Sequence, residues 1–172
     1  MTANPPNPNT SIQNLEQQYL TFSLGEELYA VEILKVQEIR GWTDVTPIPN
    51  CPTFIRGVLN LRGEIVPIVD LRRRFSMSDV PFTSFTVVIV LNLSARTVGI
   101  MVDSVSDVLD FKAEDIRSAP DFGTSIDATY LRGLCPTKDK MVIVLDAEKL
   151  LGAAQLAAIN AATETSEQAH AD

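Results

Sequence analysis

The sequence predicts an all-β protein built as small barrels or as a sandwich, and three observations favour this class. Short apolar or alternating runs are separated by turn residues along most of the chain. Helical periodicity is absent until about residue 146. The chain also matches itself in two long blocks, which indicates two copies of one β-unit.

The first half contains two hairpin patterns. Residues 18–24 alternate polar and apolar side chains, a turn follows at 25–27, and 28–33 continue as a second strand. Residues 58–61 and 65–70 flank Arg62-Gly63, where Gly63 can supply the positive φ of a two-residue turn. Pro67 lies within the later strand and cannot donate to a ladder, which predicts an edge strand or a bulge there.

The second half begins with an almost continuously apolar run at 86–93, which turns at 94–96 and returns as 97–102. Residues 141–145 form another short β-branched run. Asp146 is predicted to cap a helix from Ala147, because apolar residues recur there at helical spacing (Leu150, Leu151, Ala154, Ala158). The run Arg72-Arg73-Arg74 follows a strand and predicts a helical turn with a solvated basic face.

Internal repetition is the most specific feature of the pattern. Residues 22–39 align without gaps on 91–108, and residues 54–70 align without gaps on 130–146. Each unit is too small to bury a comfortable core alone, so we expect two packed barrels. The folded region is predicted at 18–152, with halves of about 18–82 and 83–152 that are free to exchange strands. Residues 1–17 and 153–172 are predicted as disordered tails, the latter after the helix end.

Composition argues against several functional classes. The formal net charge of -8 disfavours binding to nucleic acid, and no run approaches the length of about 18 apolar residues expected of a membrane helix. The N-terminus lacks the pattern of a signal peptide, and Cys51 and Cys135 belong to no CxxC motif. These features predict a cytoplasmic protein without a cofactor.

No catalytic constellation is found. His170 is the only histidine and lies in the predicted tail, which argues against a nucleophilic triad, and no phosphate-binding glycine motif occurs. A metal site would need carboxylates, but these do not follow the EF-hand order and are better explained as exposed acids (Asp103, Asp107, Asp110, Glu114, Asp115). We therefore expect a non-enzymatic protein whose partners are proteins.

The Arg62-Gly63 hairpin is the best candidate for an interaction site. Arg62 could be an ordinary turn residue, but Val36, Glu38 and Ile39 form a strip of alternating character in the same half. A planar guanidinium beside apolar side chains often anchors a protein interface. The repeat places Lys138 and Asp139 at the equivalent turn, without the Arg-Gly pair.

Two long blocks carry a family resemblance. The runs FSLGEELYAVEILKVQEIRG and FIRGVLNLRGEIVPIVDLRRRF resemble the CheW coupling proteins of bacterial chemotaxis, and the second half continues the match through VGIMVDSVSDVL and MVIVLD. The resemblance extends over about residues 18–152. It implies two five-stranded SH3-like β-barrels packed around a shared hydrophobic core, with a short C-terminal helix.

The same resemblance implies a scaffold that couples methyl-accepting chemoreceptor tips to the regulatory domain of the histidine kinase CheA, with further CheW copies as ring partners. It implies recruitment to membrane-associated receptor arrays without insertion into the membrane. Carried over by position, one group of residues would bind the receptor (Val36, Glu38, Arg62, Gly99, Ile100). A second group would bind the kinase (Ile33, Ile39, Gly57, Arg117, Phe122). A coupler in a system controlling pili or gene expression, and less strongly a metal-binding β-barrel, remain alternatives.

Overall fold

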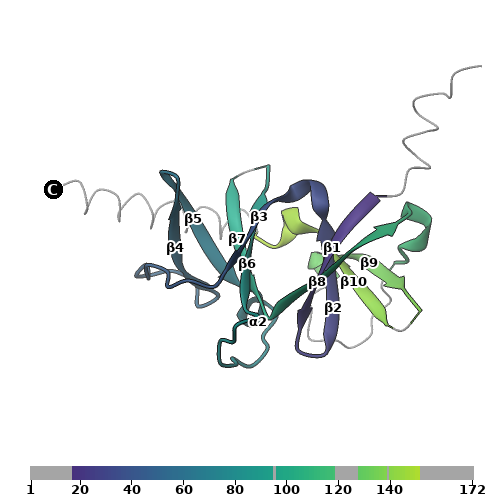
Figure 1. Cartoon of the computed structure of the whole chain (residues 1–172), viewed down its shortest axis with the longest axis horizontal. Helices are drawn as coiled ribbons and strands as arrows, with labels where there is room; N and C mark the ends of the chain where they lie inside the picture. Colours follow the sequence, from purple (N-terminus) through teal and green to yellow (C-terminus); the bar gives the residue numbers. More distant parts are fainter. Residues whose placement is uncertain (1–16, 95, 119–127, 139, 152–172) are drawn as a thin grey trace, which may run out of the picture.

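The computed structural model describes residues 17–94, 96–118, 128–138 and 140–151. Its strands form two five-stranded sheets with very little helix, which confirms the all-β class (Figure 1). The elements in chain order are β1 (Gln17–Leu24), β2 (Glu27–Glu32), η1 (Ile33–Lys35), β3 (Val36–Gly41), β4 (Ile55–Leu61), β5 (Glu64–Asp70), α2 (Leu71–Arg74), β6 (Val87–Asn92), β7 (Thr97–Val102), β8 (Ser104–Phe111), η2 (Ala113–Asp115), η3 (Ala128–Tyr130), β9 (Leu131–Pro136), β10 (Met141–Leu145) and η4 (Ala147–Lys149).

Each sheet closes into a barrel. Barrel 1 has the strand order β8-β1-β2-β10-β9, and the chain beyond β8 reaches β9 through the bridge between Arg117 and Leu134. Barrel 2 has the order β3-β6-β7-β5-β4, and the chain beyond β3 reaches β4 through the bridge between Thr46 and Val58. Figure 1 shows barrel 2 on the left and barrel 1 on the right.

The strands are exchanged between the two halves of the sequence. Barrel 2 uses only β3 to β7, whereas barrel 1 combines β1 and β2 with β8, β9 and β10. The chain therefore crosses between barrels twice, at η1 and at Asp103. Neither barrel corresponds to residues 18–82 or 83–152 alone.

Strand pairing reproduces the internal repeat in detail. Phe22 pairs with Tyr29 between β1 and β2, and the equivalent residues Leu91 and Val98 pair between β6 and β7. Phe22 of β1 also pairs with Val105 of β8. The equivalent residues of the other barrel, Leu91 of β6 and Val36 of β3, pair in the same way. Both barrels thus have the same strand order, and each combines the first two strands of one repeat with the last three strands of the other.

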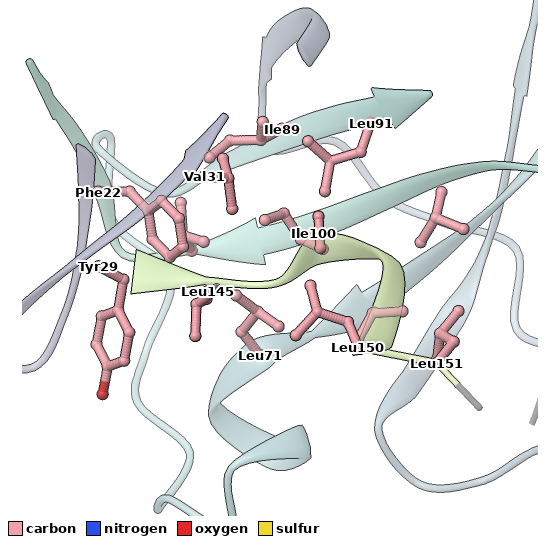
Figure 2. Close-up of a cluster of buried hydrophobic side chains, with 14 of the residues drawn as sticks. Phe22, Tyr29, Val31, Leu71, Ile89, Leu91, Ile100, Leu145, Leu150 and Leu151 are labelled. Carbon is pink, nitrogen blue, oxygen red and sulfur yellow. The ribbon is translucent and has the colours of Figure 1, made fainter. Parts of the chain in front are cut away.

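One hydrophobic core lies between the barrels. Its fully buried members include Phe22 from barrel 1 and Ile89, Leu91 and Ile100 from barrel 2. Leu71 and Leu150, which follow β5 and β10, contribute to the same cluster (Figure 2). Because apolar side chains of both barrels share this cluster, burial of apolar area holds the barrels together.

One local expectation, the edge position of the strand that contains Pro67, needs correction. The strand containing Pro67 is internal, since β5 lies between β7 and β4. Its parallel ladder with β7 begins only at Ile68, and the pairing with β4 is irregular between Ile55 and Gly57. At the start of the predicted C-terminal helix the structure describes the 3-10 turn η4, capped by the Asp146 side chain, which accepts from the Glu148 N–H. The rest of that predicted helix, including Ala154 and Ala158, lies outside the described residues, as do both predicted tails except Gln17.

Candidate protein-interaction surface

The tip of the β4–β5 hairpin presents Arg62 to solvent. Arg62 and Gly63 have φ values of 53° and 88°, so both central residues of the turn adopt the left-handed conformation. The Asn60 Oδ1 atom accepts a hydrogen bond of 2.8 Å from the Gly63 N–H and stabilises the turn. The Arg62 side chain is 70% exposed. This local geometry holds a cation at a rigid tip.

Glu38 of β3 lies beside this tip. The Arg62 Nη2 atom is 3.0 Å from Glu38 Oε1. Along β3 the half-buried residues Val36 and Glu38 alternate with exposed Gln37 and Ile39. Val36 packs against the shared core. The structure therefore brings Glu38 and Arg62 into contact, and Val36 begins the same strand as Glu38.

Gly99 and Ile100 lie in β7, which β6 separates from β3 in the sheet of barrel 2. All of β7 is buried, and the Ile100 side chain has no exposed area (Figure 2). A Cβ atom at Gly99 would lie 2.6 Å from Ile68 Cδ1 and 2.8 Å from Val88 Cγ1. These two residues shape the sheet from inside and do not contact solvent.

The residues assigned to the kinase contact differ in their exposure and in the barrel to which they belong. Ile33 in η1 packs against the shared core, whereas Ile39 on the edge strand β3 is 45% exposed. Gly57 is buried at φ 152°, and a Cβ atom there would overlap the Thr46 carbonyl oxygen. Arg117 is exposed and lies on barrel 1, where its N–H donates to the Leu134 carbonyl at 2.8 Å. Phe122 lies outside the described residues.

The sequence analysis missed Leu34, which is 91% exposed in η1 between two anchored neighbours. Lys35 beside it forms an ion pair of 2.8 Å with Glu148. The repeat held a signal, because the position equivalent to Leu34 is Asp103, a charged residue. An apolar side chain at a position that its copy fills with a charge is a candidate contact for a partner.

The three consecutive arginines form the predicted helical turn, but its basic face is not solvated. The Arg72 Nε atom lies 2.8 Å from Asp103 Oδ1, and Arg73 Nη2 lies 2.9 Å from Asp79 Oδ2. Arg74 stacks between two aromatic rings. The Asp70 side chain caps the turn by accepting from the N–H groups of Arg72 and Arg73.

Asp103, one of the acids of the alternative metal site, serves a structural contact. Burial pushes the pKa of this carboxyl upward, but hydrogen bonds from Arg72 and the Gly25 N–H hold the pKa below its usual value. Within the described part of the chain, no three metal-ligating side chains gather into a site. Burial raises the pKa of both thiols, Cys51 and Cys135, which favours the neutral form.

Among the described residues, no helix has the length and apolar character needed to cross a membrane.

The family model of the CheW-like domain matches residues 18–155. The chemotaxis protein CheW of Klebsiella aerogenes is 51% identical over 148 residues, which cover 86% of this chain and 89% of the relative. The corresponding protein of Rhizobium meliloti is 34% identical over 139 residues, which cover 81% and 90%.

A solved structure gives the same result for the fold. The scaffolding protein TtCheW from Thermoanaerobacter tengcongensis superimposes with a TM-score of 0.76 at 30% identity, covering 90% of this chain and 96% of that one. The two closed barrels are thus the SH3-like pair of this fold, and the family consists of non-enzymatic adaptors. From its sequence blocks, its strand-exchanged barrels and these relatives, the chain belongs to the CheW family of chemotaxis coupling proteins.

Proposed function

We propose that this protein couples the cytoplasmic tips of methyl-accepting chemoreceptors to the regulatory domain of the histidine kinase CheA. The observation that carries the proposal is the surface of barrel 2 formed by Val36, Glu38 and Arg62. It combines an exposed guanidinium, a half-buried carboxylate and a half-buried apolar side chain on rigid strands. Such a surface suits a helical protein partner with both polar and apolar side chains.

The receptor role extends to buried residues through packing. Gly99 and Ile100 would act by fixing β7, which pairs with both β6 and β5. A larger residue at Gly99 would push Ile68 or Val88 and move the strands that carry the surface. We therefore assign these two residues to positioning and the three exposed or half-buried residues to contact.

Kinase binding would use two faces on different barrels. Ile39 offers an exposed apolar side chain on edge strand β3, with Ile33 and Gly57 shaping the adjoining parts of barrel 2. Arg117 offers a cation on barrel 1, and Phe122 would complete that contact. Two faces on opposite barrels allow one molecule to engage two neighbours, so kinase domains and couplers could alternate in rings.

Coupling in this scheme depends on geometry and needs no chemical step. A receptor bound at barrel 2 and a kinase bound at both barrels are held by one rigid body, so a movement of the receptor biases the conformation of the kinase. Each contact is expected to be small and weak alone, and to become strong through multivalency in an array. The protein would thus act in the cytoplasm at receptor arrays.

The test is co-sedimentation with receptor signalling domains and CheA, combined with kinase activity. Arg62→Glu should reduce receptor-dependent kinase activation, and Arg117→Glu should retain receptor binding but reduce kinase incorporation. Lys138→Glu is the matched control, because Lys138 is exposed at the equivalent hairpin of barrel 1 and the charge change is the same. Unchanged activation by a folded Arg62→Glu protein would overturn the proposed role.

A further inference from the structure

Arg74 links the two barrels at the place where the internal repeats meet. It belongs to α2, directly after β5 of barrel 2. Its Nε atom donates a hydrogen bond of 2.9 Å to the carbonyl of Leu150, which follows β10 of barrel 1. Leu150 is the residue equivalent to Arg74 in the second repeat. Equivalent residues of the two copies thus contact each other.

The guanidinium also lies between two aromatic rings that are equivalent to each other. The Arg74 Cζ atom is 4.6 Å from the ring centroid of Phe54, which precedes β4, and 4.5 Å from that of Tyr130, which precedes β9. Each distance is within the range of cation–π attraction. One ring belongs to each repeat, so the planar cation fills the space between the barrels with a contact on either side.

Burial of apolar area is not directional and does not by itself select one angle between the barrels, and the described core consists mainly of aliphatic side chains. A guanidinium that must stack on two rings and donate to one carbonyl permits a much narrower set of arrangements. Tyr130 is further held by Phe75, whose ring centroid lies 5.9 Å away.

We propose that Arg74 is a positioning residue that fixes the orientation of barrel 1 relative to barrel 2. This inference rests on the proposed function for its biological meaning, because the receptor-facing surface lies on barrel 2 and Arg117 on barrel 1. A change in the angle between the barrels would leave each binding face intact. It would change the distance and angle between the two faces, so that receptor and kinase could no longer be engaged at the same time.

The test compares Arg74→Met, which keeps the length of the side chain without its charge, with Arg74→Lys, which keeps a cation and a donor. Arg73→Met is the matched control, because Arg73 lies in the same turn but contacts Asp79 and the Thr53 carbonyl, both close to it in barrel 2. All variants are made in the full chain, and their folding is checked by thermal unfolding.

The first readout is the distance between spin labels at Ser84→Cys and Glu114→Cys, in a Cys51→Ser, Cys135→Ala background. Both label sites are exposed, one next to barrel 2 and the other next to barrel 1. The parent protein and Arg73→Met should give one narrow distance distribution. Arg74→Met should broaden or shift it, and Arg74→Lys should fall between. An unchanged distribution for Arg74→Met would overturn the proposal.

The second readout separates binding from coupling. Arg74→Met should bind receptor signalling domains and CheA individually as the parent does, yet reduce receptor-dependent kinase activation at least about fivefold, the lower end of usual coupling strengths. Full activation despite a broadened distribution would show that coupling does not depend on the angle between the barrels, and it would overturn the functional part of the proposal. If Arg74→Met does not fold, Arg74→Lys is used instead: a broader or shifted distance distribution supports the proposal, and an unchanged one overturns it. The distance measurement needs no partner, so it reports on Arg74 even if Arg62→Glu disproves the proposed function.

Discussion

Arg62 Nη2 lies 3.0 Å from Glu38 Oε1, and this ion pair joins the tip of the β4–β5 hairpin to edge strand β3. The Arg62 side chain remains 70% exposed, so water screens the attraction between the two charges. A pair of this kind contributes at most about 1 kcal/mol to stability. The charge at this position can therefore be altered without unfolding the protein.

Arg62→Asn should leave the free energy of unfolding within about 1 kcal/mol of the parent, because asparagine tolerates the positive φ of this turn. Arg62→Val should cost about 1–2 kcal/mol more, since a β-branched residue is strained there. Urea unfolding measures both. A loss well above about 2 kcal/mol for Arg62→Asn would show that the guanidinium is structural. A stable Arg62→Asn protein then gives a second, turn-preserving test of receptor binding.

Gly57→Ala and Gly133→Ala should both destabilise the protein by about 2–3 kcal/mol. A Cβ atom at either position would overlap a backbone carbonyl, that of Thr46 or that of Arg117, and each barrel closes at this point. Gly57→Ala should cost more, because Gly57 also has a φ of 152°. Gly41→Ala is the control, since nothing lies within 4 Å of its Cβ position. Equal stability of all three variants in urea would contradict this account of closure.

Asp70 and Asp146 occupy equivalent positions but should differ in their contribution to stability. Asp70 is 1% exposed and accepts from two backbone N–H groups and, at 2.9 Å, from Arg56 Nε. Its replacement by alanine removes the nearest carboxylate of the partly buried Arg56, which keeps only a 4.0 Å contact with Asp79 and a cation–π contact with Phe82, and should cost about 3 kcal/mol. Asp146→Ala removes a more exposed cap and should cost about 1 kcal/mol. Denaturant unfolding of the two variants tests the order, and a reversed order would be incompatible with these contacts.

Acid should weaken the protein partly through Asp103. Its pKa lies below the usual value in the folded state, so the unfolded chain binds more protons on acidification. The stabilisation is complete above about pH 4 and is lost as the pH falls through the lowered pKa. Asp103→Asn should therefore lose less stability than the parent as the pH falls below about 4.

The measurement is the urea midpoint as a function of pH for Asp103→Asn, with Glu114→Gln as the control. Glu114 is an exposed carboxylate of the same half of the chain, so this control separates the removal of a carboxylate from the loss of the contact with Arg72. Parallel curves for the parent and Asp103→Asn would show that the contact with Arg72 does not favour the ionised carboxyl.

The repeat made most of the strands predictable. One constant shift relates residues 22–39 to 91–108 and another relates residues 54–70 to 130–146, and the paired registers follow these shifts. The exchange of the β1–β2 and β6–β7 hairpins between the repeats was not predictable, because a repeat defines which strands are equivalent and does not define which copy supplies the neighbour. Pro67 led to the wrong expectation of an edge strand. Its missing N–H is compatible with the internal position of β5, because the ladder between β5 and β7 begins only at the next residue, Ile68.

The contacts of individual side chains were harder to predict from the sequence than the strands. The sequence analysis singled out Arg62, and its proximity to Glu38 follows from barrel closure, which brings the hairpin tip back to β3. Arg72, Arg73 and Arg74 are chemically identical and consecutive, yet they have three different sets of partners. These partners, such as Asp103 and Tyr130, come from distant parts of the chain, and local patterns carry no information about them.

The most direct test of the central claim is a titration of isotopically labelled protein with a receptor signalling domain, followed by backbone amide chemical shifts. The account predicts that the largest changes lie at Val36, Glu38 and Arg62 on barrel 2, and that Arg117 and Lys138 on barrel 1 change little. Arg62→Glu should abolish the changes while the rest of the spectrum stays the same. Changes centred on barrel 1, or changes that persist in Arg62→Glu, would contradict the account.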